Sequence, residues 1–279
     1  MTLTGLTVLL TREVRDNGPL KARIIELGGQ VVESPLISIQ HVSDNLIEEA
    51  WFRLRKERLE GSLTLRGIAV TSANALAAAE HLLGSEEEGF FSPCFVVGER
   101  TARAAAQMGL KAIHPEGVKN ALGLAAYLCT KAVMLGTYAR TSSTAYTEQP
   151  RNNWLLWLRG QMADEAFRSE LERHGWIVDD IVCYETILRE VSQSAWAQVS
   201  RAPRVAVVFY SPSAVQAFVK SSVVHEDPLT EVPMFIAVGE TTKVALLKNG
   251  LGPNVAALSP TIEGVLDAIV QVNERSSFA

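Results

Sequence analysis

Glycine, hydroxyl and arginine residues follow several short apolar runs of this sequence. The clearest example occurs twice: Val97-Gly98-Glu99-Arg100-Thr101 returns as Val238-Gly239-Glu240-Thr241-Thr242, at an offset of 239 − 98 = 141 residues. In each copy an apolar run precedes the glycine and an Ala/Leu-rich segment follows it, which predicts a buried strand, a tight turn and a helix. Such a turn directs backbone N–H groups and the positive end of a helix dipole at one point, so the chemistry it favours is anion binding.

Other residues repeat in the same order along the chain. Arg159 follows Arg12 by 147 residues, and Ser211 follows Ser72 by 139. This ordered repetition indicates a duplication, and the fall in offset from 147 to 139 places a net insertion of about eight residues in the first half. The alternation of strand and helix patterns predicts an α/β protein with parallel sheets covered by helices on both faces, one sheet per domain.

Open parallel sheets bind ligands outside the carboxyl ends of their strands. The residues expected at those ends are mostly hydroxyl, glycine or arginine, which suit a carboxylate or phosphate. The candidate ligand-binding residues are Thr11, Arg12, Thr71, Ser72, Asn74, Gly98, Thr101, Arg159, Gly160, Ser211, Ser213, Gly239, Thr241 and Thr242. They include no Ser–His–Asp set, Cys–His set or carboxylate pair, so we expect a site that binds and orients its ligand.

Each candidate has a structural alternative. A Ser or Thr before a helix can be an N-cap that contacts no ligand. Arg12 and Arg159 could form salt bridges between domains. Gly98 and Gly239 belong to no dinucleotide-binding or Walker motif, which argues against a nucleotide site. Tyr184 ends an apolar run and is either a core or hinge residue or the proton donor of a site that lacks other acids.

Composition limits the class of protein. The 279 residues are 47% hydrophobic and 20% charged, as in globular proteins, and the net charge of −5 argues against nucleic acid as a partner. No apolar stretch reaches the roughly 18 residues of a membrane helix, and the first ten residues do not resemble a signal peptide. The three cysteines are expected to be reduced core residues, and the five histidines show no metal-ligand spacing. We therefore expect a soluble, cytoplasmic protein without a metal.

Several elements can be predicted individually. Residues 45–60 should form an amphipathic helix whose basic run is a solvated face, and residues 75–83 another helix. Residues 177–178 and 181–184 should form two short strands, and residues 134–153 a loop.

The ordered set of motifs resembles the uroporphyrinogen-III synthase family over essentially the whole chain. The motifs are Thr11-Arg12, Gly28 before a strand and Pro35, Thr71-Ser72, Val97-Gly98 with Thr101, Tyr184-Glu185-Thr186, Phe209-Tyr210-Ser211-Pro212-Ser213, and Val238-Gly239 with Thr241-Thr242. Glu13 departs from the pattern, since a proline commonly follows the Thr-Arg pair.

The resemblance implies two similar flavodoxin-like domains joined by a two-stranded linker, with a cleft between them. The domains would be residues 1–37 plus 184–279, and residues 38–183. Tyr184, Thr101, Ser211 and Thr242 would line the cleft, with Tyr184 as the catalytic residue.

The implied activity is that of a lyase, with no cofactor. It would cyclise the linear tetrapyrrole hydroxymethylbilane, invert the terminal pyrrole ring and lose water. The protein would be a monomer in porphyrin and haem biosynthesis. The competing interpretation is a non-catalytic two-domain sensor or binding protein for a small polyanion.

Overall fold

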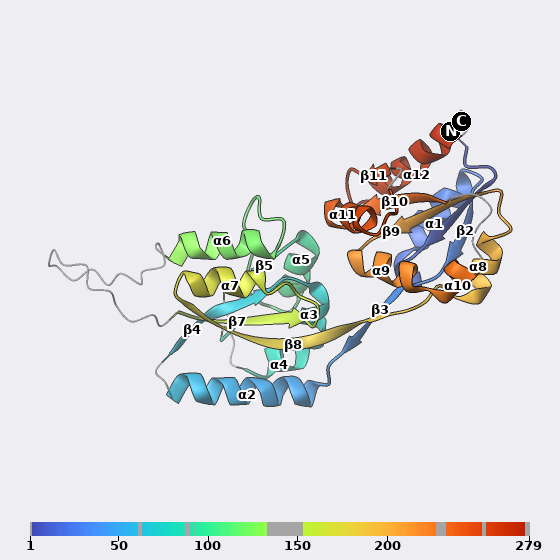
Figure 1. Cartoon of the computed structure of the whole chain (residues 1–279). Coiled ribbons are helices and arrows are strands. Elements are labelled where there is room, and N and C mark those ends of the chain that lie inside the picture. The colour runs from blue at the N-terminus through green and yellow to red at the C-terminus, as the bar shows by residue number, and fades with distance from the viewer. Residues whose placement is uncertain are drawn as a thin grey trace. The chain divides into compact units, whose positions relative to one another are not determined.

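The computed structural model describes residues 2–60, 63–86, 90–91, 93–132, 153–226, 233–252 and 255–276. The chain forms two compact units, each built on its own sheet (Figure 1). Unit 1 comprises Met1–Ser38 and Ile187–Ala279, and unit 2 comprises Ile39–Thr186. Unit 1 is therefore discontinuous in sequence, because unit 2 is inserted between its two parts.

The sheet of unit 1 has the order β2-β1-β9-β10-β11, and its neighbouring strands pair in parallel. Numbered along the chain, this is the order 2-1-3-4-5 of a doubly wound sheet, whose direction of winding reverses between its first and third strands. The strands are β1 (Leu6–Leu10), β2 (Gln30–Glu33), β9 (Arg204–Phe209), β10 (Met234–Val238) and β11 (Val255–Ala257).

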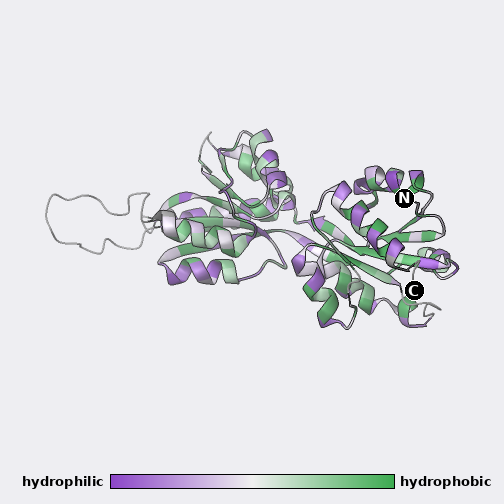
Figure 2. Ribbon diagram, turned by 90° about the horizontal axis from the view of Figure 1, so that it is seen from above, coloured by the Kyte–Doolittle hydropathy of each residue, from purple (hydrophilic) through white to green (hydrophobic). Residues whose placement is uncertain are grey.

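Helices cover both faces of this sheet because successive strand residues point to opposite sides. Val8 packs with α1 (Gly18–Glu26) and α12 (Ile262–Ser276), whereas Leu9 packs with the helices of the other face. Figure 2 shows hydrophobic residues along the strands and hydrophilic residues on outer helix surfaces. The helices of the Leu9 face are α8 (Gln193–Val199), α9 (Pro212–Lys220) and α11 (Glu240–Lys248), and the short elements are η1 (Val14–Asp16) and α10 (Ser222–Glu226).

The sheet of unit 2 has the order β3-β8-β7-β4-β5-β6, and its strands from β8 to β6 pair in parallel. β3 lies outside the repeated pattern. If β7 and β8 are numbered 1 and 2, and β4, β5 and β6 are numbered 3, 4 and 5, the other five strands again have the order 2-1-3-4-5. The strands are β3 (Ile37–His41), β4 (Thr64–Val70), β5 (Cys94–Val96), β6 (Ala112–Ile113), β7 (Asn153–Gly160) and β8 (Trp176–Leu188). The shared strand order supports the duplication that the sequence indicates.

Unit 2 also has helices on both faces. Trp51 of α2 stacks on Trp154 of β7 with ring centroids 5.8 Å apart, and Phe167 of α7 packs on Trp157 at 4.7 Å on the opposite face. The helices of the Trp51 face are α2 (Asp44–Glu60), α3 (Ala73–Ala78), α4 (Glu80–Ser85) and α5 (Glu99–Gln107), and those of the other face are α6 (Ala121–Ala132) and α7 (Ala166–Arg173).

Two paired strands carry the chain between the units. β3 lies beside β8, where the backbone N–H of Val42 donates to Cys183 and that of Arg189 donates to Leu36. The residue numbers of the two strands run in opposite directions across these bonds, so the pairing is antiparallel. The unit boundaries at Ser38 and Thr186 fall within these strands.

Several predicted elements differ from the structure. The helix predicted over residues 75–83 is divided into α3 and α4, and the two predicted short strands are one strand, β8. The basic face of α2 is not simply solvated, because Arg55 pairs with Glu86 and Arg58 pairs with Asp179. The loop predicted over residues 134–153 lies outside the described residues except for Asn153, which begins β7.

Candidate functional site

The carboxyl edge of each sheet brings predicted ligand-binding residues together, within each unit separately. In unit 1, β1 and β9 are neighbours at the point where the winding reverses, so Thr11 and Arg12 lie beside Ser211. In unit 2, β7 and β4 are the equivalent neighbours, so Arg159 and Gly160 lie beside the segment after Val70. Ligands of doubly wound sheets bind at these reversal points.

Thr11 is a structural residue of this edge. Its side chain is 1% exposed, and its Oγ1 donates to the carbonyl of Val208 at 2.7 Å. The bond joins the ends of β1 and β9. The predicted role of Thr11 as a direct ligand is therefore not supported by the position of its hydroxyl.

Arg12 is half-buried and held by neutral groups. Its Nε donates to Asn17 Oδ1 at 2.9 Å, its Nη2 donates to the carbonyl of Asp16, and its guanidinium lies 4.6 Å from the ring centroid of Tyr210. Asn17 in turn donates to Glu33 at 2.8 Å, and Lys21 pairs with Glu33 at 2.6 Å. Burial would raise the pKa of Glu33, but hydrogen bonds from Lys21 and Asn17 and the charge of Lys21 together lower it.

Tyr210 and Ser211 follow β9. Ser211 is the N-cap of α9, since its side chain accepts from the N–H of Ala214 at 3.2 Å, and Ser213 lies half-buried in the first turn. Burial raises the pKa of Tyr210 to about 12, although the charge of Arg12 opposes the shift. The Tyr210 hydroxyl is buried and has no hydrogen-bond partner among the described residues.

The repeated glycine turns begin two helices, as predicted. Gly98 precedes α5 with φ of 82° and Gly239 precedes α11 with φ of 91°, a region that favours glycine. Thr101 and Thr242 lie in the first turns but are only 5% and 1% exposed. Their hydroxyls are therefore poorly placed to contact a ligand, whereas the first N–H groups of a helix have no partner within the helix.

The two turns differ in their surroundings. In unit 2 the N–H of Gly98 donates to His114 Nε2 at 3.2 Å, so one of the backbone amides predicted to bind an anion already has a hydrogen-bond partner. In unit 1, Thr241 is exposed beside a groove of about 390 Å³ between α9 and α11. The groove is lined by Pro212, Gln216, Glu240, Thr241, Val244, Ala245, Lys248 and Asn249.

Tyr184 reaches the residues that follow β4. Its hydroxyl donates to Ser72 Oγ at 3.2 Å, and Ser72 also accepts from the N–H of Asn74 as the N-cap of α3. Both acceptor positions of the Ser72 oxygen are thus used, which leaves its own O–H available to a ligand. Thr71 is half-buried next to it.

Gly160 makes room for the phenol of Tyr184. A Cβ atom at Gly160 would lie 2.4 Å from Tyr184 Cζ and 2.7 Å from its hydroxyl oxygen. The backbone is also irregular here, because the β7–β8 register shifts between Arg159 and Gly160. Gly160, predicted as a ligand contact, leaves the space that the Tyr184 phenol occupies.

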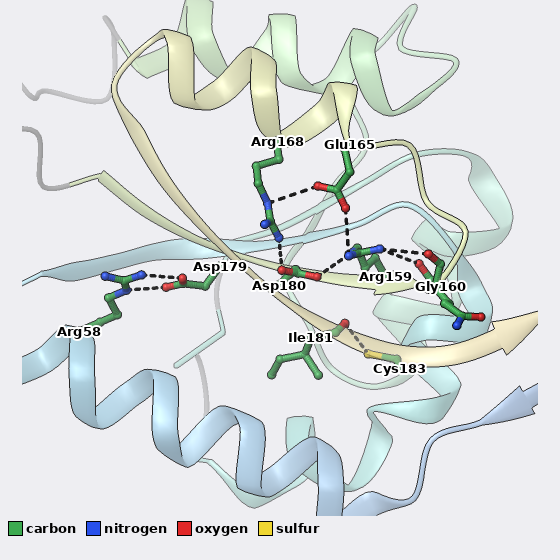
Figure 3. Close-up of polar contacts among 10 residues, drawn as sticks. Arg58, Arg159, Gly160, Glu165, Arg168, Asp179, Asp180, Ile181 and Cys183 are labelled. Carbon is green, nitrogen blue, oxygen red and sulfur yellow. Dashed lines mark hydrogen bonds and ion pairs between the residues drawn. The ribbon is translucent and has the colours of Figure 1, made fainter.

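Arg159 is embedded in an ion-pair network (Figure 3). It pairs with Asp180 through Nε and with Glu165 at 3.0 Å, and Arg168 pairs with both carboxylates. All of these residues belong to unit 2. The charge of Arg159 is therefore already neutralised by its neighbours.

The described residues contain no cluster of three or more His, Cys, Asp or Glu that could hold a metal. Burial raises the pKa of both Cys94 and Cys183 to about 12, which makes these thiols poor nucleophiles. No helix in the described ranges is long and apolar enough to span a membrane.

Sequence reasoning did not select Tyr210 or His114 as site residues. Tyr210 directly precedes the selected Ser211, and His114 follows the short strand β6, next to β5. Applying the strand-end rule to every strand would have found both residues. Their specific contacts, with Arg12 and Gly98, depend on which strands are neighbours.

Comparison with known proteins gives a consistent result. A family model described as Uroporphyrinogen-III synthase HemD matches residues 18–267. A curated uroporphyrinogen-III synthase of Synechococcus elongatus (strain ATCC 33912 / PCC 7942 / FACHB-805) is 30% identical over 125 residues, which are 43% of this chain and 45% of that protein. The match thus spans less than half the length of that relative.

Solved structures share the fold at low sequence identity. A mutant uroporphyrinogen III synthase of the extremely thermophilic bacterium Thermus thermophilus has a TM-score of 0.62 and 16% identity, covering 97% of this chain and 99% of that chain. The uroporphyrinogen-III synthetase of Helicobacter pylori 26695 has a TM-score of 0.58 and 15% identity, covering 95% and 99%. At these identities the likeness shows an α/β fold of parallel sheets and helices common to the three proteins.

Proposed function

Since the chain belongs to the uroporphyrinogen-III synthase family, we propose that it cyclises hydroxymethylbilane to uroporphyrinogen III, with inversion of the terminal pyrrole ring and loss of water. The observation that carries the proposal is the extent of the family match, because residues 18–267 include parts of both units. The product belongs to the tetrapyrrole pathway that leads to haem.

The donors at the two sheet edges suit this substrate, a linear tetrapyrrole with carboxylate side chains. Arg12, the amides before α11 and the hydroxyl of Ser72 can each donate to an anion. We propose that these donors bind the carboxylates of the substrate in this way. Binding at several points would fold the linear substrate into the shape from which one ring closure is favoured over the other.

Loss of water from the substrate is the step at which an acid would help. The phenol of Tyr184 would give its proton to the departing hydroxyl group, which leaves as water, and would become a phenolate. The pyrrole that carried the hydroxymethyl group would become an electron-poor azafulvenium cation, and the pyrrole at the other end of the substrate would attack it to form a spiro intermediate. The proton lost from the ring carbon at aromatisation would return to the phenolate, so the cycle needs no cofactor or redox partner.

The finer architecture belongs to the same proposal. We propose two flavodoxin-like domains, residues 1–37 plus 184–279 and residues 38–183, joined by a two-stranded linker. The strand order of each sheet and the pairing of β3 with β8 support this division. We further propose that the enzyme works as a monomer in the cytoplasm.

The test is an assay in which the product isomers are resolved. The purified protein would receive freshly generated hydroxymethylbilane, and the products would be oxidised to porphyrins and separated by chromatography. Because the bilane tends to close without inversion on its own, an excess of isomer III over a protein-free control supports the proposal. Isomer I alone, together with tight binding of the tetrapyrrole, would instead indicate a non-catalytic binding protein.

A further inference from the structure

Arg12 and Arg159 occupy equivalent strand ends of the two sheets but have opposite electrostatic surroundings. Arg159 is neutralised by Asp180 and Glu165. Arg12 makes no ion pair with any residue of the described ranges, and the contacts of its guanidinium are with the Asn17 amide, a backbone carbonyl and the Tyr210 ring.

The carboxylate that Asn17 joins to the Arg12 network is balanced by another residue. Glu33 accepts from Asn17 at 2.8 Å and pairs with Lys21 at 2.6 Å, so its charge is countered by Lys21. Asn17 lies between Glu33 and Arg12 and bonds to both side chains. Arg12 is therefore positioned by this network without being neutralised.

The remaining donors of Arg12 are available. Its Nε and Nη2 have partners, whereas Nη1 has none among the residues that the structure describes. A half-buried guanidinium that is fixed in orientation and lacks a counter-ion is suited to bind a carboxylate. Its place beside β9, at the reversal point of the sheet, is also where doubly wound sheets bind ligands.

We propose that Arg12 binds a carboxylate of the tetrapyrrole substrate, and that Tyr210 is the positioning residue whose ring holds the guanidinium in place. Arg159, by contrast, serves the internal ion-pair network of unit 2. This assignment rests on the proposed function. It gives different roles to Arg12 and Arg159, which occupy equivalent positions in the repeated sequence.

The experiment compares Arg12→Met with Arg23→Met in the full-length protein. Arg23 belongs to the same unit, and its pair with Glu26 is exposed, so the control removes an equal charge. We expect Arg12→Met to raise KM for hydroxymethylbilane by about 10- to 100-fold, with a smaller change in kcat. This range corresponds to the usual contribution of one hydrogen bond to a charged group. Equal KM values for the two variants would overturn the assignment.

A second readout does not depend on turnover. Uroporphyrin III, a stable tetrapyrrole polycarboxylate, would be titrated by quenching of tryptophan fluorescence. Weaker binding by Arg12→Met than by Arg23→Met supports the assignment, whereas equal affinities, or no binding by either, contradict it. Failure of the wild-type protein to form isomer III would reject the proposed function separately.

The role of Tyr210 has its own test. Tyr210→Leu removes the aromatic platform and should raise KM several-fold, and Tyr210→Phe should recover most of that loss because the ring is kept. Thermal unfolding of both variants controls for general destabilisation. A loss of the same size in Tyr210→Phe would show that the hydroxyl acts instead of the ring.

Discussion

At the scale of single residues, Tyr184 is the proposed proton donor and lies in unit 2. The phenol bonds to Ser72, a residue 112 positions away in sequence, and lies over a glycine. The type and spacing of residues could suggest Tyr184 as a proton donor. They could not identify Ser72 as its partner, because that contact depends on β7 lying between β8, which carries Tyr184, and β4.

The first prediction concerns the acid. Tyr184→Phe removes the hydroxyl and keeps the ring, and we expect turnover to fall by about 10²- to 10⁴-fold, the usual contribution of a general acid. Single-turnover kinetics with isomer analysis would measure the effect. An unchanged kcat would remove Tyr184 from the mechanism.

Gly160→Ala tests the space beside the phenol. The new methyl group would lie within 2.4 Å of the Tyr184 ring, so the tyrosine must move, at a cost of about 1–3 kcal/mol in the free energy of unfolding. We expect lower stability together with slower turnover. Gly84→Ala is the control, because nothing lies within 4 Å of a Cβ atom there.

Glu33 should make stability depend on pH. Its pKa is lower in the folded state than in the unfolded chain, so its stabilising effect is present above the ordinary pKa of about 4.3 and is lost as the pH falls through the folded value. Glu33→Gln should therefore be less stable than wild type at pH 7, and the gap should narrow in acid. Urea unfolding at several pH values measures this, and Glu26→Gln, in an exposed pair, should show little difference at any pH.

At the scale of elements, the sequence predicted the repeated strand, glycine turn and helix correctly. Both turns need a positive φ, which glycine supplies, and each helix ends shortly before another glycine, Gly109 or Gly250. β8 was predicted wrongly as two strands because Asp179 and Asp180 interrupt its apolar pattern. Those carboxylates remain in a strand because Arg58, Arg159 and Arg168 pair with them, and such partners cannot be read from local sequence.

Helix capping gives a prediction at this scale. Ser211 and Ser192 each accept from the N–H of the residue three positions later, both at 3.2 Å. Replacing either serine by alanine should cost about 1 kcal/mol of stability. If Ser211 also contacts substrate, only Ser211→Ala should lower kcat/KM, and equal kinetics in the two variants would leave Ser211 with a capping role alone.

At the scale of the whole molecule, each unit has its own pair of hydrophobic clusters. The prediction of parallel α/β sheets is confirmed, and it rested on the alternation of strand and helix patterns in both halves. Sequence reasoning could not tell that Arg159 is neutralised, or that Arg12 lacks an ionic partner among the described residues. Each result depends on contacts between side chains from different elements.

Thiol labelling should report on unit 2 specifically. Cys94, Cys129 and Cys183 all lie in that unit, and burial raises the pKa of Cys94 and Cys183 to about 12. We expect these two to react with iodoacetamide at pH 8 only when unit 2 opens. Leu156→Ala, in the core of unit 2, should speed labelling, since such changes cost about 2–5 kcal/mol.

The matched change in unit 1 is Leu9→Ala, at an equally buried leucine. If the units unfold independently, it should leave the labelling rate of Cys94 and Cys183 unchanged. Mass spectrometry of the labelled peptides measures the labelling rate of each cysteine. An equal increase of this rate in both variants would show that the two units unfold in one cooperative transition.

The insertion of unit 2 within unit 1 has a consequence for biosynthesis. β1 is translated before unit 2, yet its partner β9, which pairs with it from Leu6–Arg204 onward, is translated only after all of unit 2. Unit 2 should therefore be able to fold first, while the four apolar residues of β1 still lack their β9 neighbour. A chaperone that shields extended apolar segments would find its binding site at β1, during the interval before β9 is translated.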